Sequence, residues 1–259
     1  MSEGLTPEGS AHAEYWDGLA KTYQEETHIS LDDFHYGPLL PGDKELQLLP
    51  SQLKGKTCLE LGCGAGQNSI VLAKAGAECI SIDVSEHMLE YGRLLANQEG
   101  VSSDFRKADQ DALPKFGTSF DLIHSAYGVP FSSDPKQLIQ NCADLLNPDG
   151  VLLFSMGHPV YAGEWLELDE DQGLFLQNYF HPTPDVREGD GDAVSRAYPL
   201  SEVTEWIHQA GLQLDRILEP TALSETRLQE APYYSKGWAE QAEELRRFPI
   251  VVIIKAVKN

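Results

Sequence analysis

The sequence predicts an α/β protein in which helices cover both faces of a mostly parallel sheet, forming a three-layer α/β/α sandwich. Between residues 56 and 156, short apolar runs alternate with segments of helical periodicity, which is typical of parallel strands joined by crossover helices. The 259 residues are 41% hydrophobic and 23% charged, and they show no internal repeat. This composition indicates one large globular domain with appendages rather than a disordered chain.

Seven strands are expected in a single sheet. Apolar runs bounded by turn residues predict them, and the last two are expected to pair antiparallel at the sheet edge. The predicted strands are Thr57–Leu61, Glu78–Ile82, Ser103–Lys107, Phe120–His124, Val151–Ser155, Leu212–Leu218 and Ile250–Val257.

Helices are predicted where apolar residues recur at helical spacing and capping residues mark the ends. Asp134 and Pro135 open one helix, and Ser201 is the expected N-cap of another. The other predicted helices are Ala11–Glu26, Gln67–Ala75 and Glu86–Asn97. Four parts follow from this order: a helical N-terminal cover (1–50), a ligand-binding core (51–156), an insertion that serves as a lid (157–198) and a C-terminal completion of the sheet (199–259).

The charge is strongly acidic, with 19 Lys and Arg against 41 Asp and Glu, a formal net charge of -22. Such a surface repels phosphate, so nucleic acids and anionic membranes are not expected as partners. The four cysteines have no metal-site or disulfide spacing, so no metal is expected. Because no long apolar run and no signal-peptide pattern is present, we expect a soluble, cytoplasmic protein.

A glycine-rich turn follows the first predicted strand and leads into a helix, with the sequence ELGCGAG from Glu60 to Gly66. Glycines at such a turn allow a ligand to approach the backbone closely. The spacing G-x-G-x-G differs from the dinucleotide fingerprint G-x-G-x-x-G. Glu60 would also repel a phosphate, so the turn favours a cationic ligand.

Two further acids are expected at the same edge of the sheet. Asp83 ends the second strand, and Asp109 follows the third. Open α/β sheets bind ligands at the carboxyl ends of their strands. A carboxylate at Asp83 can accept hydrogen bonds from both hydroxyls of a ribose.

The motifs ELGCGAG, SIDVS, ADQDALP, FDLIHS and LLNPDGVLLFS, in this order across residues 57–156, resemble those of class I S-adenosylmethionine-dependent methyltransferases. The resemblance implies a Rossmann-like fold and S-adenosylmethionine as the methyl donor. It places Glu60 near the donor's amino group, Asp83 at the ribose and Asp109 at the adenine amine. The further donor contacts that we expect are Gly62, Gly64, Gly66, Gln110 and the backbone near Ser125, together with Tyr23 and Tyr36 from the N-terminal cover.

A looser resemblance links the chain after Met156 to small-molecule methyltransferases. It rests on Gly157-His158-Pro159, Asn178-Tyr179-Phe180 and the R-x-Y-P-L segment that begins at Arg196. It implies a small-molecule acceptor that is methylated on nitrogen or oxygen. His158 is the candidate base or substrate contact, with a loop-packing role as the alternative. The candidate substrate contacts are Tyr127, Trp165, Tyr179 and Tyr198.

Two other functions remain open from the sequence. A non-catalytic S-adenosylmethionine-binding regulator would carry the same glycine-rich turn. A nicotinamide-dependent oxidoreductase would share the sheet, although the glycine spacing opposes it. The sequence does not indicate the oligomeric state. The segment HSAYGVPF after the fourth strand differs from the N/D-P-P-Y/F/W motif, which argues against methylation of nucleobase amines or of glutamine.

Overall fold

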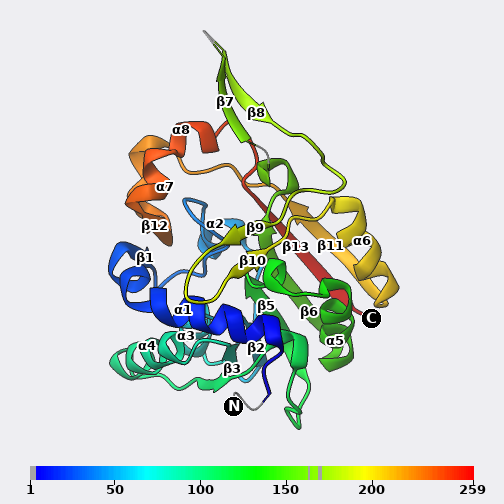
Figure 1. The fold of residues 1–259 in the computed structure, drawn as a ribbon. Helices are drawn as coiled ribbons and strands as arrows, with labels where there is room; N and C mark the ends of the chain where they lie inside the picture. The colour runs from blue at the N-terminus through cyan, green and yellow to red at the C-terminus, as the bar shows by residue number, and fades with distance from the viewer. Residues whose placement is uncertain (1–3, 163, 169–170) are drawn as a thin grey trace.

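The computed structural model describes residues 4–162, 164–168 and 171–259, and it leaves the side chains of residues 163–172 undescribed. Helices cover both faces of a central seven-stranded sheet, giving a three-layer Rossmann-like sandwich (Figure 1). The strands of this sheet are β2 (Thr57–Leu61), β3 (Glu78–Asp83), β4 (Asp104–Lys107), β5 (Phe120–Ala126), β6 (Leu146–Gly157), β11 (Leu212–Leu218) and β13 (Val251–Lys258).

The order of the strands in the sheet is β11-β13-β6-β5-β2-β3-β4. The C-terminal strand β13 runs antiparallel to both neighbours, while the pairs from β6 to β4 are parallel. The predicted mostly parallel sheet with an antiparallel C-terminal strand is therefore confirmed. Within the central sheet, the chain enters at β2, continues outward through β3 to β4 and then returns to β5 on the other side of β2. Ligands bind at such a switch point, beyond the carboxyl ends of the strands.

The helices pack on the sheet through apolar faces. They are α1 (Pro7–Glu26), α2 (Asp43–Leu46), α3 (Gln67–Lys74), α4 (Glu86–Gln98), α5 (Pro135–Leu145), α6 (Leu200–Gln209), α7 (Lys236–Glu240) and α8 (Ala242–Leu245). Short 3-10 turns are η1 (Gln110–Ala112), η2 (Val129–Phe131), η3 (Pro159–Ala162) and η4 (Glu225–Glu230). In the described part of the chain, no helix has the length and apolar character needed to cross a bilayer.

Two large buried clusters lie on opposite faces of the sheet. In the first, Leu138 of α5 and Val203 of α6 pack with the strands. In the second, Leu72 of α3 packs with strand residues and with Leu39 and Leu40 from the segment after α1. Alternation along the strands sends successive side chains to opposite clusters. The sheet is therefore covered on both faces, as parallel sheets require.

Two helices begin at other residues than predicted, because their N-cap residues differ from the expected ones. Helix α1 begins at Pro7 rather than Ala11, because the Thr6 side chain accepts a hydrogen bond from the Gly9 backbone N–H. Helix α6 has Pro199 as its N-cap, so Ser201 lies in the first turn instead of capping it. Helix α5 has the predicted Asp134 cap, which accepts from the Gln137 backbone N–H.

Residues 4–50 contain more than one type of element. After α1, the short strand β1 (Thr27–Ile29) pairs antiparallel with β12 (Tyr233–Ser235). The following segment packs into the core, where Phe34 and Tyr36 are buried with exposed fractions of 2% and 1%. Helix α1 alone is therefore the helical cover, and residues 34–40 belong to the core beneath it.

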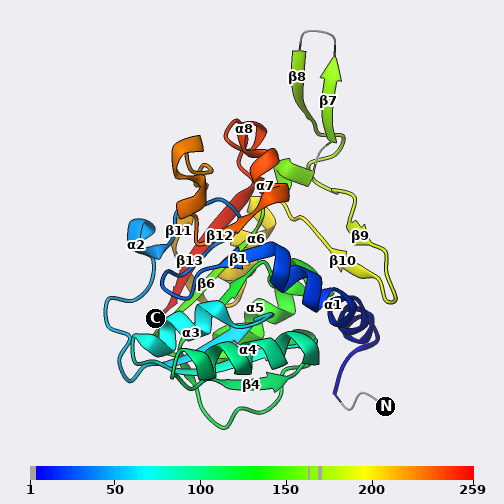
Figure 2. The same ribbon diagram turned by 90° about the vertical axis from the view of Figure 1, so that its left-hand side faces the viewer.

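Residues 157–198 contain two hairpins that the sequence pattern did not predict. One joins β7 (Glu164–Leu168) to β8 (Asp171–Phe175), and the other joins β9 (Asp185–Arg187) to β10 (Ala193–Ser195). The β7–β8 hairpin projects away from the body, whereas β9–β10 lies beside α1 (Figures 1 and 2). The backbone N–H of Val194 donates to His12 Nε2 of α1 at 3.1 Å. Helix α1 and β9–β10 together enclose the carboxyl edge of the sheet.

Candidate functional site

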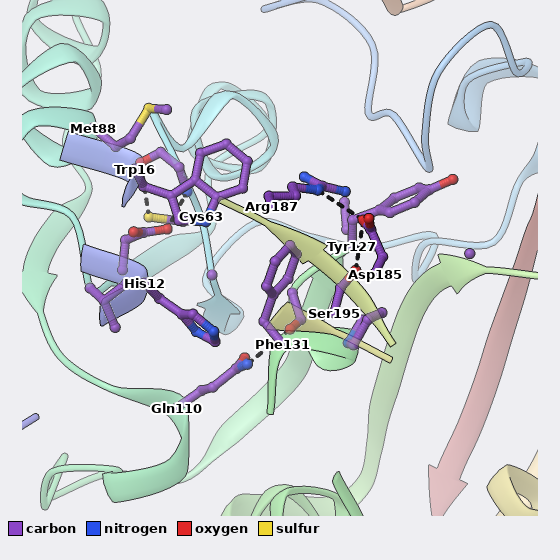
Figure 3. A pocket seen from close by; sticks show the side chains of 18 of the residues that line it. His12, Trp16, Cys63, Met88, Gln110, Tyr127, Phe131, Asp185, Arg187 and Ser195 are labelled. Carbon is purple, nitrogen blue, oxygen red and sulfur yellow. Dashed lines mark hydrogen bonds and ion pairs between the residues drawn. The ribbon is translucent and has the colours of Figure 1, made fainter. Parts of the chain in front are cut away.

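A cavity of about 810 Å³ lies at the carboxyl ends of β2, β3 and β5 (Figure 3). Its walls come from these strand ends, from α1, from the turn that contains η2 and from the β9–β10 hairpin. The volume is within the range of sites that enclose small molecules. The glycine-rich turn and the acids at the strand ends form one side of this cavity.

The three glycines of the turn have positive φ angles, 60° at Gly62, 55° at Gly64 and 63° at Gly66. Gly62 and Gly64 line the cavity. A Cβ atom on Gly64 would meet no heavy atom within 4 Å, so the backbone here faces open space. A Cβ on Gly66 would lie 2.4 Å from the Phe105 ring, so this glycine serves the packing of the turn and is not among the lining residues.

Asp83 is fixed by the glycine-rich turn. Its Oδ2 accepts from the Gly64 backbone N–H at 2.7 Å, and its Oδ1 accepts from the Ser85 backbone N–H at 2.8 Å. Burial raises the pKa of this carboxyl, and the two backbone hydrogen bonds oppose the rise. A carboxylate has about four acceptor positions, so each oxygen retains one. The arrangement is suited to a pair of neighbouring hydroxyls in the cavity.

Glu60 lies at the end of β2, lines the cavity and is only 3% exposed. Its Oε2 accepts from the Ser69 backbone N–H at 3.1 Å. Burial raises the pKa of Glu60 to about 8. A cationic group of a ligand beside this carboxyl would favour its ionised form and lower that pKa.

A cluster of buried polar groups surrounds Glu60. His124 of β5 is its register partner, and His124 Nδ1 lies 3.8 Å from Glu60 Oε1. Burial lowers the pKa of His124 to about 3 and that of His35 to about 4, so both imidazoles are neutral at physiological pH. The His124 ring packs against the Phe34 ring, with their centroids 5.2 Å apart.

Several buried atoms of this cluster have no hydrogen-bond partner among the described residues: both ring nitrogens of His124, His35 Nδ1 and Ser69 Oγ. Buried polar groups are normally paired with protein, water or ligand. His35 lines the cavity, and its backbone is fixed at both ends by the Asn68 side chain. The sequence analysis did not single out His35, although a polar ligand end beside Glu60 could bind it.

Asp109 and Gln110 lie at the opposite end of the strand edge, and both line the cavity. Asp109 Oδ2 accepts from the backbone N–H and the hydroxyl of Thr6, at 2.9 and 2.7 Å, which ties the start of α1 to this acid. Asp109 Oδ1 accepts from the Asp111 backbone N–H. Gln110 Nε2 donates to Gly128 O, while its buried Oε1 has no partner in the described residues. An amine donor of a ligand could therefore be accepted here.

The other predicted donor contacts differ in position. Tyr23 lines the cavity, and its hydroxyl is 2.9 Å from that of Tyr233. The Ser125 hydroxyl instead donates to Leu61 O at 2.8 Å and braces the turn behind the cavity wall. Tyr36 points away from the cavity and donates its hydroxyl to Asp43 Oδ1, because its ring belongs to the buried core.

Of the three predicted substrate contacts whose side chains the structure describes, only Tyr127 lines the cavity. It has a φ of 65°, which is uncommon for a residue with a side chain. Tyr198 packs against the Trp206 ring of α6 at 5.0 Å, and the Tyr179 ring contacts Phe180. Both lie outside the cavity wall. The Trp165 side chain lies outside the described part of the chain.

His158 lines the cavity just after β6, and both of its ring nitrogens are engaged. Nδ1 accepts from the Val160 backbone N–H at 3.1 Å, and Nε2 lies 2.7 Å from Glu219 Oε1. With Nδ1 an acceptor, the imidazole proton is on Nε2 and is donated to Glu219. The ring is held firmly, but neither nitrogen is free to accept a proton from a substrate in this arrangement.

Four cavity residues were not predicted as ligand contacts. His12 and Trp16 are presented by α1, Phe131 by η2 and Arg187 by β9 (Figure 3). His12 is buried and lines the cavity. The i, i+4 spacing of His12 and Trp16 was the available signal, since it places both on one face of the helix. No sequence pattern marked Arg187, because a hairpin in an irregular segment positions it.

Comparisons with known proteins agree with this fold. Residues 59–154 match the family model described as a methyltransferase domain. A ubiquinone biosynthesis O-methyltransferase of Coxiella burnetii is 31% identical over 162 residues, which is 62% of this chain and 65% of that enzyme. The chain thus aligns with less than two thirds of the length of this curated relative.

Solved structures resemble the fold over most of the chain. An S-adenosylmethionine-dependent methyltransferase from Mesorhizobium loti has a TM-score of 0.65 with 23% identity, covering 82% of this chain and 95% of that one. The cyclase SpnF has a TM-score of 0.63 with 16% identity, covering 98% and 97%. The sheet order and these similar structures define a Rossmann-like fold. Within this fold, residues 59–154 are similar to a methyltransferase domain.

Proposed function

We propose that this protein transfers the methyl group of S-adenosylmethionine to an oxygen atom of a small-molecule acceptor. The observation that carries the proposal is the row of acids along one cavity wall. Glu60, Asp83 and Asp109 lie at the ends of β2, β3 and β4 and match the ammonium, the ribose hydroxyls and the adenine amine of the donor. The choice of oxygen follows the O-methyltransferase relatives. A cytoplasmic location and the absence of a nucleic-acid partner are part of the proposal.

When bound, S-adenosylmethionine supplies a methyl group made electrophilic by the positive sulfur. The protein then has to align the acceptor oxygen, exclude water and let the acceptor proton leave as the O–C bond forms and the C–S bond breaks. Helix α1 and the β9–β10 hairpin cover the cavity, and the backbone N–H of Arg196 donates to Pro130 O at 2.9 Å to join the hairpin to η2. These contacts provide the enclosure.

A thermal-shift screen with S-adenosylmethionine, S-adenosylhomocysteine, NAD and NADP tests the donor. A ligand that binds only the folded state raises the melting temperature. We expect stabilisation by the first two compounds alone. Stabilisation by a nicotinamide dinucleotide alone would contradict the proposal and favour an oxidoreductase.

One of the similar structures is a cyclase, so the fold alone does not determine the reaction. A non-catalytic S-adenosylmethionine-binding protein is the second candidate. Donor turnover distinguishes the two. Formation of S-adenosylhomocysteine that depends on an added acceptor supports catalysis, whereas tight donor binding without turnover over a broad acceptor panel supports the second candidate.

Replacing Asp83 with alanine should weaken S-adenosylhomocysteine binding by about 1–3 kcal/mol, the scale of lost charge-assisted hydrogen bonds. Isothermal titration calorimetry on the folded variant measures the change. Asp104→Ala, on the neighbouring strand β4 and exposed, is the matched control and should bind normally. Equal affinity of Asp83→Ala and the wild type would place the ribose contact elsewhere.

Replacing His158 with alanine should mainly raise KM for the acceptor, because its two ring nitrogens are already engaged. A general base would instead show a kcat lowered by about 10²-fold or more. Steady-state kinetics with an active acceptor separates the two roles. Glu219→Gln, which keeps a hydrogen-bond acceptor for Nε2, should retain a kcat near that of the wild type. A large loss of kcat in His158→Ala would restore His158 as the base.

A further inference from the structure

The charged residues of the cavity are divided between its two sides. The strand edge carries the acids that we assign to the donor. On the other side, Arg187 of β9 and Arg196 just after β10 are the only Lys or Arg residues among the described residues that line the cavity. In a chain with a net charge of -22, two arginines at one wall are a local departure from the acidic surface.

Arg196 is committed to helix α1, since its Nη1 forms a 2.8 Å ion pair with Glu8. Arg187 is held differently. Its guanidinium carbon lies 5.5 Å from the centre of the Phe131 ring and 5.9 Å from that of Trp16. These contacts hold the guanidinium against aromatic rings, a favourable place for this cation.

The polar contacts of Arg187 leave part of its guanidinium available. Nε donates to Asp185 Oδ2 at 3.0 Å, and the side chain is 40% exposed. Within the described part of the chain, its two terminal nitrogens form no hydrogen bond, although the guanidinium as a whole is ion-paired with Asp185. Figure 3 shows the side chain extending between the Trp16 and Tyr127 side chains. The terminal nitrogens of a guanidinium form a planar fork that binds oxyanions.

The charge of Arg187 also reaches the tyrosines of the cavity. Burial raises the pKa values of Tyr23, Tyr127 and Tyr233, and in each case Arg187 opposes the rise. All three tyrosines line the cavity. The guanidinium therefore favours an ionised oxygen in this space, although the tyrosines themselves stay protonated.

The surrounding wall is rich in aromatic side chains, from Trp16 on α1 to Phe131, Tyr127, Tyr161 and Trp238. Flat apolar ligands pack well against such rings. We propose that the acceptor is an aromatic small molecule bearing an oxyanion, either a phenolate or a carboxylate, and that Arg187 is the specificity-determining residue that binds this oxyanion. The inference rests on the proposed function and adds the class of acceptor.

The overall charge makes the opposite class, a cationic amine, the natural competitor. An acidic surface attracts amines by long-range electrostatics. The charge next to the ligand determines which class of acceptor is preferred, however, because exposed charges farther than about 10 Å are largely screened at ordinary salt concentrations. The guanidinium of Arg187 would repel an ammonium placed between the aromatic side chains.

Equilibrium binding to matched probes tests the inference, with the protein saturated with S-adenosylhomocysteine. The probes are 2-naphthoate and neutral 2-naphthamide, 4-nitrophenolate and neutral 4-nitroanisole, and the cation 2-naphthylmethylammonium. We expect the wild type to prefer at least one anion over its neutral partner by roughly tenfold or more, the scale of a hydrogen-bonded charge. The anion that is preferred distinguishes a phenolate from a carboxylate.

Arg187→Gln should abolish that preference and leave the affinity for S-adenosylhomocysteine unchanged. Arg216→Gln, an exposed arginine on β11 away from the cavity, is the matched control and should behave as the wild type. Asp185→Asn should increase the preference, because it removes the carboxylate that competes for the guanidinium. This variant decides the outcome if Arg187→Gln does not fold.

The inference would be overturned if the wild type showed no preference for an anion or bound the ammonium probe most tightly. It would also be overturned if the anion preference were unchanged in Arg187→Gln or did not increase in Asp185→Asn. The proposed function fails separately, through an absence of S-adenosylhomocysteine binding by the wild type. In that case the anion preference can still be measured on the free protein.

Discussion

Gly64→Val is expected to weaken S-adenosylhomocysteine binding by about a hundredfold or more. Gly64 has a φ of 55°, and its missing Cβ faces open space in the cavity. A branched side chain would occupy the space where a ligand lies against the turn, and it would disfavour the positive φ that lets the Gly64 N–H donate to Asp83. A loss of this size is about 2.7 kcal/mol.

Calorimetry with S-adenosylhomocysteine measures this effect, and Gly117→Val is the matched control. Gly117 also has a positive φ, 72°, and a Cβ there would also meet nothing within 4 Å. Because Gly117 does not line the cavity, its variant should show the same backbone strain with normal affinity. If both valine variants bind as tightly as the wild type, the glycine-rich turn is not the donor site.

The central sheet could be predicted from the sequence because its signals are local. Strands β2 and β11 have the predicted bounds, and the acids at Glu60 and Asp83 fall at the carboxyl edge as the strand pattern requires. Strand β6 begins at Leu146, before the predicted Val151, since Leu146 pairs with Phe120 ahead of an irregularity in the ladder. Such a pairing depends on the neighbouring strand, so the local pattern does not reveal it.

The acceptor side of the cavity could not be predicted in the same way. Arg187 lies in a three-residue strand, and its neighbours Trp16 and Phe131 are more than 50 residues away in the chain. Short hairpins have little period of their own. Tyr36 is the opposite case, a residue predicted to contact the ligand that does not line the cavity. Its position in the N-terminal segment suggested a ligand contact, but its ring is buried in the core and its hydroxyl donates to Asp43.

The same distinction applies to Asp109. The strand pattern predicts an acid at this edge, and Asp109 lines the cavity. Its two hydrogen bonds from Thr6 are a tertiary contact between residues 103 positions apart. A Cβ on Gly9 would lie 2.1 Å from Asp109 Oδ2, so the close approach of α1 depends on that glycine. Helix α1 and Asp109, which we assign to the donor's adenine amine, are therefore one structural unit.

Glu60→Gln is expected to weaken S-adenosylhomocysteine binding by about a hundredfold, because it removes the buried carboxylate that we assign to the ligand's ammonium. The variant should also abolish the pH dependence of binding. In the free protein, burial raises the pKa of Glu60 to about 8, so the carboxyl is mostly protonated at pH 7. Pairing with an ammonium requires the ionised form, and the wild type should release close to one proton on binding.

The groups that face Glu60 support this assignment of the proton. Asp83 on β3 raises the pKa of Glu60 further, while the Ser69 backbone N–H on α3 opposes the rise. His124 on β5 and His35 in the segment after α1 stay neutral, because burial lowers their pKa values to about 3 and about 4. Between about pH 6 and pH 7.5, Glu60 is then the group in this cluster that titrates on binding.

Calorimetry in two buffers of different ionisation enthalpy counts the released protons. Wild-type affinity should increase as the pH rises from about 6 to about 7.5, and the upper limit keeps the ligand's own amino group charged. Glu60→Gln should show no proton release and a flat affinity in this range. Glu78→Gln, exposed at the start of β3, is the matched control and should behave as the wild type.

The free protein provides an independent readout of the same carboxyl. A pKa raised from 4.5 to about 8 means that the folded state keeps a proton that the unfolded chain releases. The stability contributed by Glu60 is therefore fully present below about pH 4.5 and is lost as the pH rises to about 8. Without ligand, Glu60→Gln should melt at a higher temperature than the wild type at pH 8, with a smaller difference at pH 5. The contrary result is a Glu60→Gln variant that binds the ligand weakly but shows no gain in melting temperature over the wild type at pH 8. That result would show that Glu60 is ionised in the free protein, and it would refute the proposed proton release.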